Sequence, residues 1–482
     1  MSNPDSTHGI LATSRYIPRM RLERSAVAAL HAWMAPGLRA LSKGCRAVAN
    51  WDEDSITMAV EACRALRSEA SLPAPSLFTL ASTTLPFADR LNAGVALAAL
   101  GLRDDVFARD AASSMRAAST ELLVSLRNPA PEAHLLVAAE QRIPRPASTH
   151  ELICGHGAAA ALTGRGRPIA TLVAAYSAQA DFVDHFRARG DDHDYYWEER
   201  WVRDEGYLKI AVSAAESCLR QVGVAAGAVT HFVMPAPLPK VNEAVAKKLG
   251  LEPKSVVATG SETVGDMGCA QPLAMLDVAL RQASEGELIL LVAFGNGCDA
   301  LLLRRSGQPC PGVTPDDGVA DTNYMKYLSF SGLLQADWGM RAEMDNKTAL
   351  SAAWRGRSRT ARFEGGRCRL CGTAQFPAGN VCVNPQCKAQ HSLEPLSFAE
   401  LPATVLSHTS DHLAYTPHPP FRFGHIDFDG GGRVLMEFAD TVEGELRVGL
   451  PVRMVYRIKE LDPKRGFRRY FWKATPVRPL AN

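Results

Sequence analysis

Four cysteines in the last third of the sequence have the spacing of a metal site. Cys368 and Cys371 form a C-x-x-C pair, and Cys382 and Cys387 form a second pair shortly after it. A C-x-x-C turn places two thiolates on one side of a metal ion, and a second pair completes the tetrahedron that Zn²⁺ prefers. Four sulfur ligands leave no open coordination position. The pattern therefore predicts a structural zinc site, a zinc ribbon, with no catalytic role.

The second cysteine pair departs from the first in its spacing. Two further residues separate its cysteines, and Asn384 and Pro385 lie between them. His391 is an alternative ligand a few residues on. The competing interpretation is four reduced thiols that lie near one another without a metal. The other seven of the 11 cysteines are scattered singly, a pattern that indicates reduced thiols and a cytoplasmic protein rather than a disulfide framework.

Two glycine-rich segments point to an internal duplication in the first 310 residues. The segments 155–162 and 295–302 both read G-x-G-x-x-A-x-L, and an arginine follows each. Each is a poor dinucleotide fingerprint, because a strand-like run follows the glycines where a helix should begin. The segment 287–294 (ELILLVAF) precedes the second copy and predicts a buried strand. Two unrelated glycine turns are the alternative interpretation.

Helix-like and strand-like stretches alternate around these glycine turns. The alternation predicts an α/β fold built from two similar halves. The clearest amphipathic helix is Ser55–Leu66, and a short acidic run stands immediately before it. The other predicted helices are Ser113–Leu126, Gly206–Val222 and Pro272–Gln282, and the predicted strands are Thr230–Met234 and Ser255–Ala258.

The remaining sequence predicts a change of architecture after the duplicated part. We expect a domain over residues 1–310, a connecting arm over 311–362 with Trp338 and Trp354, a zinc ribbon over 363–392 and a small all-β barrel of the OB-fold type over 393–482. OB folds often bind oligonucleotides on aromatic platforms. A platform and ordinary core packing explain the barrel's aromatic residues equally well; these residues are Phe421, Phe423, Tyr456, Tyr470 and Trp472.

Composition excludes several classes of protein. A formal net charge of +2 provides no basic field for nucleic acid. No apolar run approaches the roughly 18 residues of a membrane span, and the first twenty residues have no apolar core behind a basic flank. We therefore expect a cytoplasmic protein with no membrane and no nucleic-acid partner.

Several segments resemble members of the thiolase superfamily. Residues 44–66 (GCRAVANWDEDSITMAVEACRAL) resemble the opening of hydroxymethylglutaryl-CoA synthases and ketoacyl synthase III-type enzymes. Residues 230–249 and 264–273 resemble later stretches of the same enzymes. The stretch 362–477 is similar to the rubredoxin-like zinc ribbon and OB-fold proteins that accompany thiolases. The resemblance implies a duplicated thiolase-like α-β-α-β-α fold for the first domain.

The catalytic set of these enzymes is replaced in this sequence. The resemblance puts Met115 where the nucleophilic Cys belongs, and a thioether cannot carry an acyl group as a neutral thioester. Pro235 stands in place of the catalytic His and can neither accept a proton nor donate a hydrogen bond. Asp266 falls at the usual Asn, and Thr83 at the general base Glu. The sequence therefore predicts that this chain has no catalytic residues at these positions.

Other residues are candidates for a relocated active site. Cys154, Cys269 and Cys298 lie beside the glycine turns or the third catalytic loop. His231 and Asp266 are candidates to face one cavity, with a core histidine as the alternative. The motif FVDHFR, with Asp184 and His185, and the run 195–207 (YYWEERWVRDEGY) predict a surface lid or contact arm, or a solvated helix face.

The resemblance implies a subunit of an acyl-CoA thiolase or acyltransferase complex that makes or cleaves carbon–carbon bonds. A thiolase-type partner chain would supply the catalytic Cys in a hetero-oligomer. Structural Zn²⁺ and CoA or acyl-CoA as substrate are the implied ligands, and the OB module would hold the CoA part or join the subunits. Two alternatives stay open: an active hydroxymethylglutaryl-CoA synthase-like acyltransferase with a relocated nucleophile, and, more remotely, a nucleic-acid-binding OB-fold protein.

Overall fold

The computed structural model describes residues 7–67, 72–129, 132–311, 317–336 and 349–478. The chain forms two compact units. Unit 1 comprises Met1–Ala49, Asp54–Gly94 and Asp105–Tyr327, and unit 2 comprises Asn50–Glu53, Val95–Asp104 and Leu328–Asn482. Of the connecting arm predicted over 311–362, residues 312–316 and 337–348, with Trp338, lie outside the described residues. No helix in the described ranges is long and apolar enough to cross a membrane.

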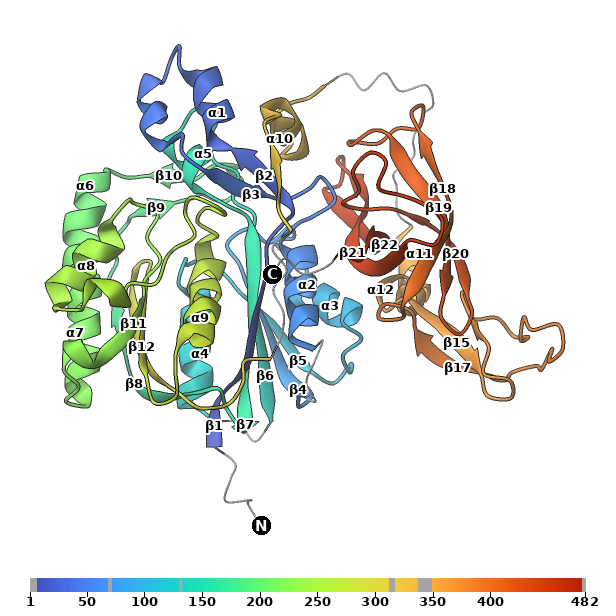
Figure 1. The fold of residues 1–482 in the computed structure, drawn as a ribbon, viewed down its shortest axis with the longest axis horizontal. Helices are drawn as coiled ribbons and strands as arrows, with labels where there is room; N and C mark the ends of the chain where they lie inside the picture. Colours follow the sequence, from blue (N-terminus) through green and yellow to red (C-terminus); the bar gives the residue numbers. More distant parts are fainter. Residues whose placement is uncertain (1–6, 68–71, 130–131, 312–316, 337–348, 479–482) are drawn as a thin grey trace. The chain divides into compact units, whose positions relative to one another are not determined.

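The main sheet of unit 1 has nine strands in the order β11-β12-β13-β8-β1-β7-β6-β4-β5 (Figure 1). They are β1 (Thr7–Tyr16), β4 (Pro75–Ala81), β5 (Phe107–Ala111), β6 (Ala133–Glu140), β7 (Gly157–Gly166), β8 (Ala170–Gln179), β11 (Val229–Val233), β12 (Leu288–Phe294) and β13 (Gly297–Arg305). A small second sheet contains β2 (Met20–Glu23), β3 (Cys45–Val48) and β14 (Val319–Asp321).

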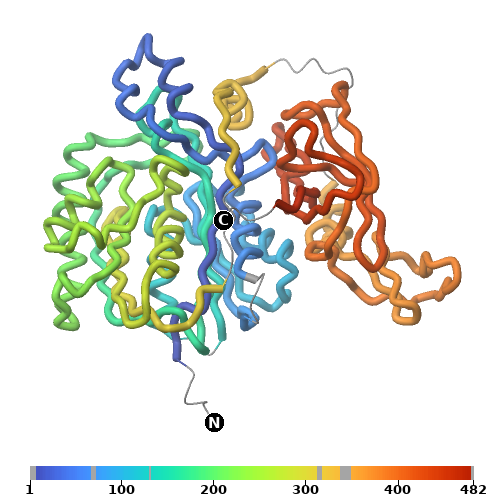
Figure 2. The backbone as a smooth tube through the Cα atoms, in the orientation of Figure 1, coloured from blue at the N-terminus to red at the C-terminus, as the bar shows by residue number. Residues whose placement is uncertain are grey.

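The nine strands form two similar halves, which confirms the predicted duplication. In the first half β4 is parallel to β6, and β6, β7 and β1 run antiparallel in turn. In the second half β11 is parallel to β12, and β12, β13 and β8 follow in the same antiparallel pattern. The halves meet where β1 pairs with β8 through Ile10 and Ala170. The tube in Figure 2 changes from blue and cyan in the first half to green and yellow in the second.

The paired glycine segments occupy equivalent places in the two halves, at the starts of β7 and β13. A Cβ atom on Gly157 would meet the sulfur of Met267 at 2.2 Å. Gly297 has a φ of +117°, and a Cβ there would meet the carbonyl oxygen of Ala178 at 2.3 Å. Only glycine fits either position without displacing its neighbours. This shared packing requirement explains why the motif recurs.

Two helices lie between the half-sheets, and others cover their outer faces. The inner pair is α4 (Ala117–Arg127) and α9 (Gln271–Gln282), whose leucines share one core with side chains from both halves. The outer helices α7 (Val212–Gln221) and α8 (Val241–Leu249) form a second core against the other face of β12 and β13. The sequence of β12 is therefore continuously apolar, because both of its faces are buried.

The predicted helices agree with the structure except at some of their ends. Helix α2 (Ser55–Arg67) forms as expected, and Asp54 caps it by accepting hydrogen bonds from the backbone N–H groups of Ile56 and Thr57. Helix α4 begins at Ala117 rather than Ser113, because Ser113 has a φ of +72°. The predicted strand Ser255–Ala258 is reduced to a single bridge between Val256 and Phe232.

The remaining helices of unit 1 lie mostly near its periphery. They are α1 (Arg24–His31), α3 (Asn92–Ala99), α5 (Thr149–Ile153), α6 (Glu199–Trp201), which runs into a π-helix (Val202–Ala211), and α10 (Tyr324–Phe330). The last residues of α3 are assigned to unit 2. A two-stranded hairpin of β9 (His185–Phe186) and β10 (Tyr195–Tyr196) precedes α6. A π-helix is uncommon and often marks a functional site.

Unit 2 contains a small ribbon and a five-stranded antiparallel barrel. The ribbon consists of β15 (Glu364–Cys368), β16 (Ala374–Gln375) and β17 (Leu393–Ser397), preceded by α11 (Leu350–Arg355) and α12 (Arg357–Ala361). The barrel strands run in the order β20-β19-β18-β21-β22, with bounds β18 (Ala403–Asp411), β19 (Phe421–Phe428), β20 (Arg433–Glu437), β21 (Pro451–Asp462) and β22 (Phe467–Pro476). Phe438, just after β20, forms a bridge to Ala474 of β22 and closes the sheet. Tyr456, Tyr470 and Trp472 are buried in this barrel, so core packing accounts for them.

Candidate functional site

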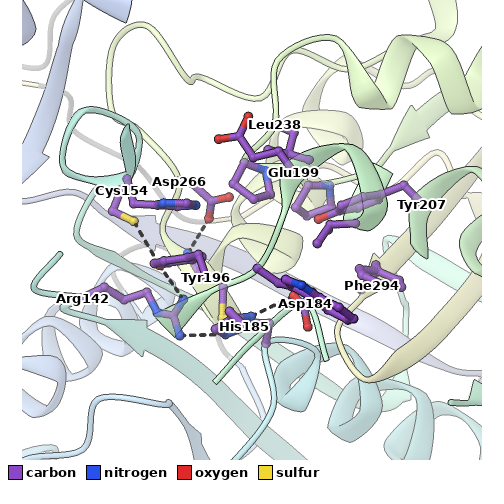
Figure 3. Close-up of a pocket in the computed structure, with 18 of the residues that line it drawn as sticks. Arg142, Cys154, Asp184, His185, Tyr196, Glu199, Tyr207, Leu238, Asp266 and Phe294 are labelled. Carbon is purple, nitrogen blue, oxygen red and sulfur yellow. Dashed lines mark hydrogen bonds and ion pairs between the residues drawn. The ribbon is translucent and has the colours of Figure 1, made fainter. Parts of the chain in front are cut away.

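The candidate site is a pocket in unit 1 at the carboxyl ends of β6, β11 and β12 (Figure 3). The space between its walls is about 770 Å³, including the open mouth. Ligand sites of α/β folds commonly lie beyond the carboxyl ends of parallel strands. The lining residues used below are Met115, Arg142, His150, Cys154, Asp184, His185, Tyr196, Trp197, Val202, Tyr207, Pro235, Leu238, Asp266 and Phe294.

Three of the four positions at which the sequence predicts a replaced catalytic residue meet in this pocket. Met115, Pro235 and Asp266 all line it, although they lie far apart in the sequence. Thr83 lies beside it, where its hydroxyl accepts a hydrogen bond of 3.4 Å from the guanidinium of Arg142. The structure therefore brings together the positions that the sequence assigned to one active site.

A buried ion pair fixes the loop that carries Met115. The next residue, Arg116, donates from Nε to the carbonyl oxygen of Gly295 at 2.9 Å and pairs with Asp299 at 2.8 Å. Asp299 also accepts hydrogen bonds from Ser119 and Thr120 in the first turn of α4. The start of this inner helix is thus held in place by buried polar contacts.

One of the three candidate cysteines lines the pocket. Cys154 lies 3.8 Å from the hydroxyl of Tyr196, and burial raises the pKa of its thiol to about 11. A thiol with that pKa is almost entirely protonated at neutral pH and is a weak nucleophile. Cys269 and Cys298 are each buried in one of the two hydrophobic cores of unit 1.

A polar network forms one wall of the pocket around Arg142. This buried guanidinium donates a 3.1 Å hydrogen bond to Nε2 of His185 and lies 3.5 Å from the carboxylate of Asp194. The other ring nitrogen of His185 contacts the carboxylate of Asp184 at 2.8 Å. The hydroxyl of Tyr196 donates to Asp194 at 3.2 Å.

The hairpin and the π-helix form much of the pocket wall. Asp184 and His185 line the pocket, a position that a lid over the site would also give them. Tyr196 stacks on His150 with ring centroids 3.3 Å apart, and Tyr207 of the π-helix also faces the cavity. Sequence reasoning missed Arg142 and Tyr196, because no local motif joins residues 142 and 196. His231 is not beside Asp266 but pairs with Glu287 at 3.1 Å.

Asp266 occupies a fixed position within the pocket. Its backbone N–H donates to the carbonyl oxygen of Ile153 at 2.8 Å, and its carbonyl oxygen accepts from Gly155 N at 2.8 Å. The side-chain Oδ1 accepts a hydrogen bond of 2.7 Å from Gly268 N. Burial raises the pKa of this carboxyl group above its usual value, although Gly268 and Arg142 act in the opposite direction.

The four clustered cysteines of unit 2 fit a tetrahedral metal ion. Their sulfur atoms all lie within 4.8 Å of one another, with 3.8 Å between Cys368 and Cys387 and 3.5 Å between Cys371 and Cys382. Zinc–sulfur bonds of about 2.3 Å in a regular tetrahedron place the sulfur atoms about 3.8 Å apart. His391 falls outside this group. The donor set is thus the one predicted from the spacing, and it suits Zn²⁺.

Comparison with known proteins finds matches to two separate stretches of the chain. The family described as 3-Oxoacyl-[acyl-carrier-protein (ACP)] synthase III C terminal matches residues 219–304, and the family described as ChsH2, C-terminal OB-fold domain matches residues 399–457. The hydroxymethylglutaryl-CoA synthase of Methanopyrus kandleri is 25% identical over 304 residues, which cover 61% of this chain and 86% of that protein. That of Aeropyrum pernix is 28% identical over 302 residues, 61% of this chain and 83% of that protein.

Over about 61% of its length the chain is thus similar to hydroxymethylglutaryl-CoA synthases. Solved structures agree on the fold of the same part. The 3-oxoacyl-[acyl-carrier-protein] synthase III of Aquifex aeolicus has a TM-score of 0.54 at 20% identity and covers 62% of this chain and all of its own length. An OleA variant of Xanthomonas campestris has a TM-score of 0.55 at 17% identity, over 62% of this chain and 98% of its own. Unit 1 therefore has the thiolase-like fold that the resemblance implied.

Proposed function

We propose that this chain is the non-catalytic subunit of an acyl-CoA thiolase or acyltransferase complex. In this proposal it binds the acyl-CoA substrate, and a thiolase-type partner chain supplies the nucleophilic Cys. The observation that carries the proposal is the meeting of Met115, Pro235 and Asp266 in one intact pocket. The site keeps its cavity and its rigid helix start but has neither a thiolate at the nucleophile position nor a histidine at the base position. Such a pocket suits binding rather than acyl transfer.

The proposal extends to unit 2. We propose that Cys368, Cys371, Cys382 and Cys387 hold one structural Zn²⁺, which stabilises the ribbon, and that the OB-fold barrel handles the CoA part of the substrate or joins the subunits. The match of residues 399–457 to the ChsH2 OB-fold family supports this role. When bound, the metal supplies structure and no chemistry, because four thiolates complete its coordination.

A second candidate function is acyl transfer through Cys154, the one candidate cysteine that faces the pocket. Its contact with Tyr196 favours this alternative. Its raised pKa argues against it, because the thiolate and not the thiol attacks a thioester.

Intact-mass spectrometry separates the two functions. Purified full-length protein incubated with acetyl-CoA should show no covalent acetyl adduct. The matched variant Cys154→Ala should give the same unmodified spectrum. The variant Met115→Cys tests whether a thiol at this position can be acylated. A stoichiometric adduct on the natural chain that disappears in Cys154→Ala would replace the proposal with the relocated active site.

A further inference from the structure

The two short helices α11 and α12 of unit 2 carry three exposed arginines. Arg355, Arg357 and Arg359 form no ion pair with a carboxylate among the residues that the structure describes. Arg355 donates one hydrogen bond to the carbonyl oxygen of Ser351 at 3.3 Å, and Arg357 donates one to that of Trp354 at 3.2 Å. A guanidinium group has five N–H donors, so most of them remain available to a partner.

Two large apolar side chains lie next to these arginines. Leu350 and Trp354 stand one helical turn apart on α11 and are 56% and 66% exposed. The guanidinium of Arg357 lies 3.9 Å from the centroid of the Trp354 ring, a cation–π contact that covers one face of the indole. Tryptophan and arginine are the residue types most enriched at the energetic centres of protein–protein interfaces. The segment therefore combines charged and apolar anchors in one place.

Arg355 and Arg359 line a groove together with residues 377–378 of the ribbon. Glu364 also lines this groove, but it forms no ion pair with either arginine within the described ranges. The planar guanidinium groups match carboxylates through paired hydrogen bonds. A groove admits side chains that protrude from another molecule, whereas the flat surface of a bilayer does not enter it. The geometry therefore favours a protein segment over a membrane.

The charge and the apolar area together define the occupant. A free phosphate would use the arginines but would leave Leu350 and Trp354 exposed. The net charge of +2 provides no wider basic field for nucleic acid. An acidic protein segment that also carries an apolar side chain complements both parts of the surface.

We propose that the surface formed by Leu350, Trp354, Arg355, Arg357 and Arg359 docks an acidic segment of the thiolase-type partner chain. Carboxylates of the partner pair with the arginines, and an apolar side chain of the same segment covers Leu350 and Trp354. This inference rests on the proposed function, because it names the part of unit 2 that holds the partner. It assigns to unit 2 the joining of the subunits.

The test measures the affinity between the purified full-length chain and a thiolase-type chain from the same organism by calorimetry. Wild-type binding should weaken about 10-fold between about 50 mM and about 300 mM NaCl, because salt screens exposed charges. The combined variant Arg355→Gln, Arg357→Gln and Arg359→Gln should bind about 10- to 100-fold more weakly at the lower salt concentration and should depend less on salt. Trp354→Ala should bind about 10-fold more weakly and keep the wild-type salt dependence.

A matched control removes the same charge elsewhere. Arg165, Arg220 and Arg447 are exposed and lie outside the proposed surface. Their combined replacement by glutamine should leave both the affinity and its salt dependence at the wild-type values. All variants should unfold at the wild-type temperature, because the replaced side chains are exposed, and this measurement separates lost docking from lost folding.

Two results would overturn the inference while leaving the proposed function intact. One is a thiolase complex that forms equally well with the triple-arginine variant and with Trp354→Ala. The other is a complex that is insensitive to these changes while vesicles containing phosphatidylserine bind the wild-type chain and not the triple-arginine variant, which would assign the surface to a membrane. If the thiolase-type chain does not bind the wild-type protein at all, the inference and the proposed function both fail.

Discussion

At the scale of single residues, burial shifts the pKa values of the ionisable groups in and beside the pocket. Burial keeps His150 neutral with a pKa of about 4 and His156 neutral with a pKa of about 3. His156 accepts a hydrogen bond from Ala49 N at 2.9 Å, and its other nitrogen contacts the carbonyl oxygen of Arg142, so the imidazole links β3 to the pocket wall. These neutral rings make the fold sensitive to acid.

The change His156→Gln tests this sensitivity. Above about pH 6.5 the ring is neutral in both the folded and the unfolded chain. As the pH falls below that value, only the unfolded chain takes up the proton, so the free energy of unfolding decreases by about 1.4 kcal/mol per pH unit until the folded pKa is reached. We therefore expect the free energy of unfolding, measured with urea at several pH values between 7 and 4, to depend less steeply on pH in His156→Gln. The difference in slope should correspond to the uptake of about one proton.

The exposed His412 provides the matched control for that experiment. His412→Gln should keep the wild-type slope, because the side chain lies in water in both states. A His156→Gln variant with the full wild-type slope would show that the buried ring does not govern acid stability.

Residue identities that depend on a local motif could be predicted from the sequence, whereas those that depend on tertiary contacts could not. Met115 was recognisable because its neighbours in the chain resemble a known motif. Arg142, Asp194 and Tyr196 form one network only because the β9–β10 hairpin folds back onto the segment that follows β6. No pattern within either segment indicates that contact.

At the scale of secondary-structure elements, the sequence predicted the regular parts better than their ends. Periodicity identified α2 and α9 almost to the residue, because both have clear apolar faces. The helix predicted from Gly206 begins instead at Val202 as a π-helix, and Gly206 lies within it against the rings of Phe182 and Phe294, where a Cβ atom would clash. Helix-propensity scales rate single residues and therefore contain no information about such tertiary packing.

The zinc ribbon is the element whose chemistry is simplest to test. Purified protein should contain about one equivalent of zinc, and Cys371→Ser should lose it, because three thiolates bind the ion far less tightly than four. The same change should lower the denaturant midpoint of unit 2, since metal binding contributes directly to folding of such small modules.

Cys45→Ser serves as the control, because Cys45 is a partly accessible cysteine outside the cluster. It should retain the metal and the wild-type midpoint. Full zinc retention in Cys371→Ser would rule out the four-cysteine assignment.

At the scale of the whole molecule, we propose that the thiolase-like unit acts together with another chain that supplies the nucleophile. The glycine motif and the alternation of helices and strands together predicted the duplication, and the structure places the two copies at the starts of the equivalent strands β7 and β13. The contents of the pocket were not predictable in the same way. They required the positions of Met115, Pro235 and Asp266 in space as well as in sequence.

Co-expression of the full chain with a thiolase-type chain from the same organism tests this claim most directly. We predict a stable hetero-oligomer on size-exclusion chromatography, with an interface above about 2,000 Å² and acyl-CoA thiolysis that requires both chains. Activity should vanish when the partner's nucleophilic Cys is replaced by alanine and should persist with Met115→Ala in this chain. A thiolase that is fully active alone and never co-elutes with this protein would contradict the account.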